Sequence, residues 1–133
     1  MSKVFLTLLF LFSCKLGFSQ EEAKSENFDR FFIQFNSDKK FQLTRIIFPL
    51  HIIHNEYITK SGKEERFIIP QKKWQHINLS NRPNLKEKYA IERISSDKIA
   101  VIYQVEDTGI HVQHFFIKVN KKWFLNLIRD DST

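Results

Sequence analysis

The residues best placed to do chemistry are Asp38, Gln42 and Arg45, which follow one another at intervals of four and three. If residues 38–45 are helical, this spacing places them on one stripe of the helix surface. An arginine there can hold a carboxylate or a phosphate through two parallel hydrogen bonds. The alternative is structural: Asp38 caps the helix and Arg45 bonds backbone carbonyls near Pro49. The structural interpretation is favoured, and a large fall in the melting temperature of Arg45→Ala without any ligand would support it.

Two histidine pairs have i, i+3 spacing, His51 with His54 and His111 with His114. Both pairs lie in segments that favour extended structure, and in a strand this spacing sends the two rings to opposite faces. A metal site needs three or four convergent ligands. We therefore predict no metal site and no cofactor.

Glu106, Asp107, His111 and His114 are the candidates for acid/base catalysis. Such chemistry needs a carboxylate or an imidazole held in an apolar pocket, whereas residues 106–109 have the composition of a solvated turn. The chain has only three glycines and no phosphate-cradling loop or serine nucleophile elbow. We assign no catalytic residue, and an enzyme remains the second hypothesis.

Apolar periodicity predicts two helices ahead of these residues. Phe28, Phe31, Phe32 and Phe35 form one helical stripe, which Ser25 could cap and Asn36-Ser37 would end. Asp38 then caps a second helix that runs to about residue 45. The phenylalanines are expected to form the helical side of the core.

The rest of the chain is expected to be mainly strands. Pro49 should interrupt the chain before an extended segment at residues 52–58, and a turn is expected at Ser61-Gly62. A strand at 66–69 ends at Pro70, which opens a helical turn carrying Trp74. A meander then follows, with strands at 89–94, 98–106, 110–119 and 123–129.

Two details of the meander concern which face each side chain occupies. Trp123, Leu125 and Leu127 should share one face of the last strand. The stretch 115–117 is apolar on both faces, which predicts a central or bulged strand. The predicted fold is α+β, with N-terminal helices packed on a strongly bent antiparallel sheet in a single domain, residues 26–131.

The N-terminus has the anatomy of a secretory signal peptide, residues 1–19, followed by a polar tether, residues 20–25. Lys3 precedes an apolar run, and Gly17 and Ser19 occupy the −3 and −1 positions of a cleavage site. The only cysteine, Cys14, leaves lipidation as the less favoured alternative. We expect export to the periplasm or the medium, and no transmembrane segment once the signal is removed. The net charge of +6 is spread over scattered lysine pairs, which argues against a nucleic-acid partner.

The stretch Phe31-Phe32-x-x-Phe35-x-x-Asp38-x-x-Phe41-Gln42-x-x-Arg45-Ile46-x-Phe48-Pro49-Leu50 resembles the signature of an exported Bacteroidetes family, the domain of unknown function 4348. The resemblance implies a nuclear-transport-factor-2-like, or cystatin-like, fold: a cone whose helices close over a bent sheet. It implies no activity, because proteins of this fold include isomerases, dehydratases, transport adaptors and assembly modules.

The sequence therefore predicts a non-enzymatic exported module that binds a small molecule or an envelope protein. The ligand would meet Gln42, Arg45, Asp38, Trp74 and Trp123 in the cone. The alternatives are a small isomerase- or dehydratase-like acid/base enzyme acting on an apolar substrate, and a structural protein anchored by a lipid on Cys14. A homodimer could form through the sheet face.

Overall fold

The computed structural model describes residues 22–55, 64–80 and 86–133. The expected signal peptide with Cys14 and the turn expected at Ser61-Gly62 lie outside these ranges. The elements, in chain order, are α1 (Phe28–Ser37), α2 (Lys39–Thr44), β1 (Ile46–Asn55), β2 (Glu64–Ile69), η1 (Gln71–Lys73), β3 (Glu87–Ser95), β4 (Lys98–Val105), β5 (His111–Val119) and β6 (Lys122–Asp130). Within the described ranges, no helix is long and apolar enough to cross a membrane.

Helix α1 turns its phenylalanine stripe into the core: Phe28, Phe31 and Phe35 are all buried. Its N-cap is Asn27, whose Oδ1 accepts a hydrogen bond from the Arg30 N–H at 3.1 Å. The prediction of Ser25 as the cap was therefore wrong, because the helix begins at Phe28 and the capping side chain must directly precede the first turn.

Helix α2 begins where the sequence predicts. Asp38 Oδ1 accepts hydrogen bonds from the N–H groups of Lys40 and Phe41 at 2.9 and 3.0 Å, which satisfies two of the donors that a helix start leaves unpaired. The helix ends at Thr44, and Arg45 closes it by donating its N–H to the Gln42 carbonyl at 3.0 Å. The chain passes directly from Arg45 into β1.

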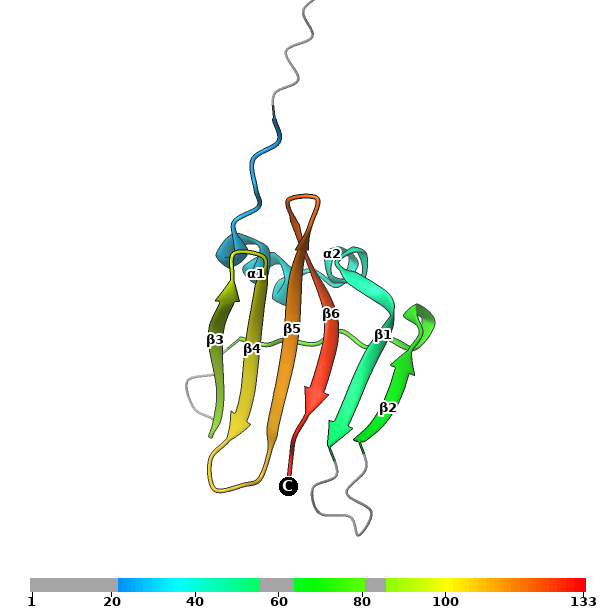
Figure 1. Cartoon of the computed structure of the whole chain (residues 1–133), viewed down its shortest axis with the longest axis vertical. Coiled ribbons are helices and arrows are strands. Elements are labelled where there is room, and N and C mark those ends of the chain that lie inside the picture. The colour runs from blue at the N-terminus through cyan, green and yellow to red at the C-terminus, as the bar shows by residue number, and fades with distance from the viewer. Residues whose placement is uncertain (1–21, 56–63, 81–85) are drawn as a thin grey trace, which may run out of the picture.

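The six strands form one mixed sheet in the order β2-β1-β6-β5-β4-β3 (Figure 1). All neighbours are antiparallel except β1 and β6, which run parallel. This corrects the expectation of a purely antiparallel sheet. The expected break at Pro49 does not end the strand, because β1 runs from Ile46 to Asn55 through Pro49; it appears instead as a register shift of β1 against β6 between Ile46 and His51.

The four strands of the meander lie close to the predicted ranges, and β5 is internal, as one of the two predicted alternatives has it, whereas the bulge lies in its neighbour β6. The bulge falls between Phe115 and Phe116, whose partners are Leu127 and Leu125. The extra residue, Asn126, turns Leu127 to the opposite face, beside His51. The predicted common face of Trp123, Leu125 and Leu127 was therefore wrong for Leu127, and Ile128 packs on the core in its place.

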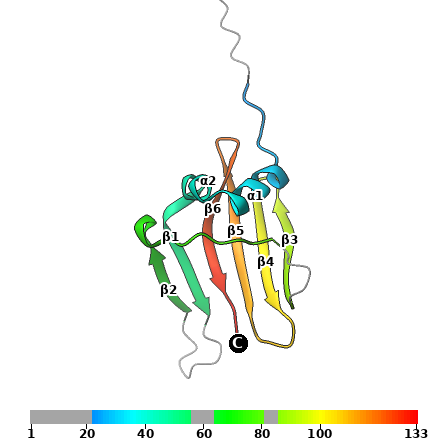
Figure 2. The same cartoon turned by 180° about the vertical axis from the view of Figure 1, so that it is seen from behind.

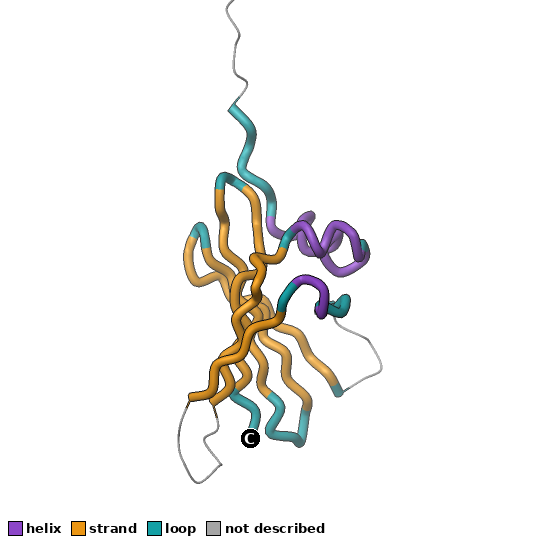
Figure 3. The backbone as a smooth tube through the Cα atoms, turned by 90° about the vertical axis from the view of Figure 1, so that its right-hand side faces the viewer, coloured by secondary structure: helices purple, strands orange, loops and turns teal. Residues whose placement is uncertain are grey.

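The helices lie on one side of the sheet, which we call the inner face; the opposite side is the outer face (Figure 3). Beneath α1 the inner face holds the core, built from Leu50, Ile99, Phe116, Trp123 and Leu125. Lower on the same face, residues 74–80 run across the sheet from the β2 side to the β3 side (Figure 2). We call these residues the crossing segment.

Candidate functional site

The strand register places six side chains in one row across the middle of the inner face. The row is apolar except for one histidine, and its members are Phe67, Ile52, Ile128, His114, Val101 and Ile91. The next row down is charged at one end and aromatic at the other: Glu65, His54, Asp130, Val112, Tyr103 and Tyr89. A single imidazole among apolar neighbours therefore lies above Val112 on β5, and the two tyrosines follow Val112 in the lower row, on the neighbouring strands β4 and β3.

The crossing segment covers the inner face from above. Leu79 is buried in the core, and its N–H donates to Asn36 Oδ1 in α1 at 2.8 Å. Ile77 is held at both its N–H and its carbonyl by the side chain of Gln42, at 3.0 and 2.8 Å. These bonds fix the segment against the helices, so it forms a stable wall over the sheet.

Two hollows, of about 370 and 410 Å³, open at the lower end of the sheet, and the larger of these two lies on the inner face. This inner-face hollow, of about 410 Å³, is lined by Ile77, Asn78, Leu79, Glu87, Tyr89, Tyr103, Val112 and His114. Its volume falls in the range of pockets that take small organic ligands, roughly 300 to 1,000 Å³.

The two tyrosines of the hollow stack on each other across strands β3 and β4. Their ring centroids are 4.9 Å apart and their planes meet at 29°, which is an offset-stacked arrangement. The Tyr89 hydroxyl donates to the Asn78 carbonyl at 3.3 Å, so it ties β3 to the crossing segment. The pair forms a flat aromatic wall with polar edges.

His114 is the buried polar group of the hollow. Only 7 % of the surface of His114 is exposed, and its Nδ1 lies 3.4 Å from the Val101 carbonyl oxygen. Burial lowers the pKa of this imidazole to about 4, against a smaller opposing effect of the Val101 carbonyl. The ring is therefore neutral near pH 7, with one nitrogen that donates and one that accepts a hydrogen bond.

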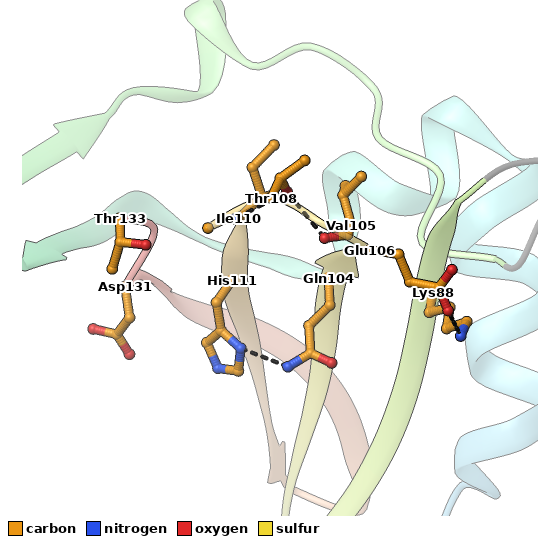
Figure 4. Close-up of a pocket in the computed structure, with 10 residues that line it drawn as sticks. Lys88, Gln104, Val105, Glu106, Thr108, Ile110, His111, Asp131 and Thr133 are labelled. Carbon is orange, nitrogen blue, oxygen red and sulfur yellow. Dashed lines mark hydrogen bonds and ion pairs between the residues drawn. The ribbon is translucent and has the colours of Figure 1, made fainter.

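A second hollow, of about 370 Å³, lies at the end of β3, β4 and β5 and contains two of the acid/base candidates, Glu106 and His111 (Figure 4). Glu106 forms an exposed ion pair with Lys88, and His111 Nδ1 is 2.8 Å from Gln104 Nε2. The third candidate, Asp107, has an exposed side chain 3.5 Å from Lys86. These groups are solvated, unlike His114 on the inner face.

The i, i+3 histidine pairs are divided between the two faces, as the strand spacing predicts. His54 and His114 belong to the inner-face rows, whereas His51 and His111 pair across strands with residues of the outer face. In the described part of the chain, no three His, Cys, Asp or Glu side chains come together as a metal-binding group.

Of the residues predicted to bind a ligand, Gln42 is fully buried and makes four hydrogen bonds. Its Nε2 donates to the carbonyls of Phe35 and Ile77, both at 2.8 Å. Its Oε1 accepts from Trp74 Nε1 and from the Ile77 N–H, both at 3.0 Å. One amide therefore joins α1, α2, Trp74 and the crossing segment.

Arg45 pairs with Glu26 through two parallel bonds, at 2.8 and 3.0 Å, and donates to the Trp123 carbonyl at 3.2 Å. Its guanidinium also lies 4.7 Å from the centre of the Phe41 ring. Burial alone would raise the pKa of the Glu26 carboxyl. The hydrogen bonds from Arg45 and from the Trp123 N–H outweigh it, so this pKa is lowered.

The structure thus distributes the five predicted residues over three places. Gln42 and Trp74 bond each other, Arg45 and Trp123 meet around Glu26, and Asp38 caps α2 on the surface. Their polar atoms have the protein partners given above, and ligand binding by them stays a prediction. Tyr89 and Tyr103 were not among the predicted site residues, although both lie in predicted strands joined by a short turn.

The fold resembles those of two solved proteins from Bacteroides. An ntf2-like protein from Bacteroides fragilis matches with a TM-score of 0.61 and 18 % identity, over 85 % of this chain and 50 % of the other, so the chain spans half of that protein's length. A cystatin-like protein from Bacteroides caccae matches with a TM-score of 0.56 and 21 % identity, over 80 % of this chain and 76 % of the other. No family model and no curated protein matches the sequence. The comparisons therefore establish an α+β fold of the ntf2-like and cystatin-like kind.

Proposed function

We propose that the protein is an exported, non-enzymatic binding module that holds a small, largely apolar molecule in the inner-face hollow. The observation that carries the proposal is the hollow itself. It combines apolar walls from Ile77, Leu79 and Val112 with one buried neutral imidazole, His114. A few polar groups among apolar walls are typical of small-molecule sites.

The lining favours a planar ligand with one hydroxyl or amide group. A flat ring can pack beside the stacked tyrosines, Tyr89 and Tyr103. A hydroxyl or amide N–H on it can donate to Nε2 of His114, because the neutral ring uses its one N–H, at Nδ1, toward the Val101 carbonyl. A charged ligand is disfavoured there, because burial already keeps the imidazole itself uncharged.

A titration with 2-naphthol, a planar aromatic alcohol, tests the proposal by NMR. We expect saturable shifts of the amide signals of Leu79, Val112 and His114, and binding at least about tenfold weaker in Tyr103→Leu, which corresponds to about 1.4 kcal/mol. His111→Gln, on the outer face, is the matched control and should bind normally. Shifts spread over other surfaces, or equal binding by Tyr103→Leu, would contradict the proposal.

An acid/base enzyme is the second candidate, and the buried imidazole of His114 is the observation that favours it. A neutral ring in an apolar hollow can accept a proton from a carbon next to a carbonyl group. The probe is 2-tetralone in D₂O, with NMR detection of hydrogen–deuterium exchange. Exchange above the buffer rate that disappears in His114→Gln would favour the enzyme, and exchange at the buffer rate favours the binding module.

The proposal of export rests on the signal anatomy of residues 1–19. The mass of the mature protein from a bacterial host tests it: cleavage after Ser19 leaves Gln20 as the first residue, whereas lipidation of Cys14 adds acyl chains. Membership of the exported family and the closed cone belong to the same proposal, whereas the dimer predicted through the sheet face is the alternative to the edge-to-edge dimer proposed below. The uncleaved mass would contradict export.

A further inference from the structure

Strand β3 lies at the end of the strand order, so β4 pairs with one of its edges and no described strand pairs with the other (Figure 1). An unpaired edge presents backbone donors and acceptors that can bind another strand. β3 also exposes two large apolar side chains, Ile91 at 45 % and Ile94 at 47 %. This edge is thus a surface on which a further strand can add.

Oppositely charged residues of β3 lie at equal distances on either side of Ala90. Lys88 and Glu92 lie two residues to either side, and Glu87 and Arg93 lie three residues to either side. The pairing of β3 with β4 is regular from residue 87 to residue 93, and the register shifts only beyond Arg93. The symmetric stretch therefore coincides with the regular part of the strand.

We propose that two copies of this chain pair antiparallel through β3 about a two-fold axis at Ala90, which makes one continuous sheet. Directly opposite residues of antiparallel strands lie on the same face. On the outer face, Lys88 of each copy then meets Glu92 of the other. On the inner face, Glu87 meets Arg93.

The apolar residues also match in this register. Tyr89 of one copy lies opposite Ile91 of the other on the inner face, and an aromatic residue beside a β-branched one is a favourable cross-strand pair. Ala90 lies opposite itself on the outer face, where its small side chain lets the backbones approach. The pairing thus covers Ile91, which a single copy leaves exposed.

Neighbouring registers lose this complementarity. An axis at Ile91 places Lys88 opposite Ile94 and Ala90 opposite Glu92, and an axis at Tyr89 places Lys88 opposite Ala90. The other edge strand, β2, does not match itself: when its Glu64 meets Arg66, its Glu65 meets Glu65 of the second copy. Charge complementarity therefore selects β3 and a single register, and identifies the partner as a second copy.

The existing ion pairs of β3 are compatible with the dimer. Arg93 contacts Asp29 of its own chain at 3.1 Å, and Lys88 contacts Glu106. A guanidinium has five N–H donors and an ammonium has three, so each cation can also bond a carboxylate of the second copy.

The dimer has a consequence for the inner-face hollow. Glu87 and Tyr89 line that hollow from β3. In the proposed register they lie opposite Arg93 and Ile91 of the second copy, so these two residues would border the hollow. A two-fold axis perpendicular to the sheet keeps both inner faces on the same side, and the two hollows then open next to each other.

Sedimentation velocity of the full chain and its charge variants tests the proposal. The wild type should sediment at twice the mass of one chain. Lys88→Glu and Glu92→Lys each place like charges opposite on the outer face, and each should raise the dimer dissociation constant at least about tenfold. An equimolar mixture of the two variants restores every outer-face pair, and so does the double variant, so both should form dimers again. This recovery also shows that the single variants fold.

A cross-link tests the register. In a Cys14→Ser background, Ala90→Cys places two thiols directly opposite at the axis, within the Cα distance that a disulfide spans. Oxidation should give a covalent dimer. The control is Ile102→Cys, because Ile102 is the partner of Ala90 on β4, the strand that lies between β3 and the rest of the sheet. This variant should run as a monomer in a denaturing gel.

A wild type that stays monomeric at all concentrations would overturn the proposal. It would also be overturned by a dimer that neither single variant weakens, which would place the interface elsewhere, such as on the outer face. A cross-link in Ile102→Cys equal to that in Ala90→Cys would exclude the register.

Discussion

Replacing His114 with a residue that does not titrate should remove most of the pH dependence of stability between pH 7.5 and 5. The folded protein keeps this imidazole neutral because burial lowers its pKa from 6.5 to about 4. As the pH falls through 6.5, the unfolded chain takes up a proton at this residue and the folded chain does not. The stability linked to His114 is therefore fully present above pH 6.5 and is lost as the pH falls toward 4.

The magnitude follows from the two pKa values. Each pH unit between them corresponds to about 1.4 kcal/mol, so the full contribution is about 3 kcal/mol, of which about 2 kcal/mol is lost by pH 5. In His114→Gln and His114→Leu this part of the loss should disappear. Carboxylates contribute equally to the wild type and the variants, so they cancel in the difference.

The assay is urea unfolding at pH 7.5, 6.5, 5.5 and 5.0 for the wild type and both variants, with the slope of the free energy of unfolding against pH as the result. The wild type should lose about 2 kcal/mol more than either variant over this interval. His111→Gln, whose ring is more exposed on the outer face, is the control and should follow the wild type. Equal losses in the wild type and the His114 variants would refute the assignment of a neutral, buried imidazole.

Two further substitutions test the contacts that position the helices. Gln42→Leu leaves the donors of Trp74 and Ile77 and two carbonyls unpaired, and should lower the free energy of unfolding, measured in urea, by about 4 kcal/mol. The control is Gln34→Leu on the exposed side of α1, which should change it by less than about 0.5 kcal/mol. Equal effects of the two substitutions would show that the four bonds contribute nothing. Arg45→Lys keeps the charge but loses the two parallel bonds to Glu26, and should lower the free energy of unfolding by about 1.5 kcal/mol. A wild-type melting curve for Arg45→Lys would mean that a point charge is enough at this position.

Local sequence patterns predict much of this fold. The phenylalanine stripe of α1 and the Asp38 cap of α2 depend on interactions within a few residues, and alternation with turn residues is enough to find β3 to β6. These elements were predictable because their stability signals lie inside the elements themselves.

The parallel pairing of β1 with β6 could not be predicted in this way, because it joins segments more than 70 residues apart. The strand through Pro49 is a similar case. Proline lacks an N–H and is therefore tolerated within a strand mainly at an edge or at a bulge, and Pro49 lies where the register of β1 against β6 shifts, between Ile46 and His51.

The candidate site was missed for a reason that concerns register. If the pairing of Ser95 with Lys98 beside the turn at residues 96–97 continued along the two strands without a shift, Tyr89 would lie opposite Gln104. The register shift between Arg93 and Ser95 instead brings Tyr89 opposite Tyr103. One irregular residue, Ile94, therefore creates the aromatic pair of the hollow, and no pattern of residue types marks it in advance.

The parallel pair also sets the order in which the molecule can assemble. β6 lies between β1 and β5, and its hairpin also receives the N-terminal contacts, through the Glu26 N–H to the Lys121 carbonyl at 2.8 Å and through Arg45 to Trp123. Without residues 122–130 the remaining strands can pair only as two separate units, the β1–β2 hairpin and the three-stranded β5-β4-β3 unit, one on each side of the missing strand. The single six-stranded sheet therefore forms only after β6, the last of the described strands, has joined the two units, so its completion depends on contacts that are distant in the sequence.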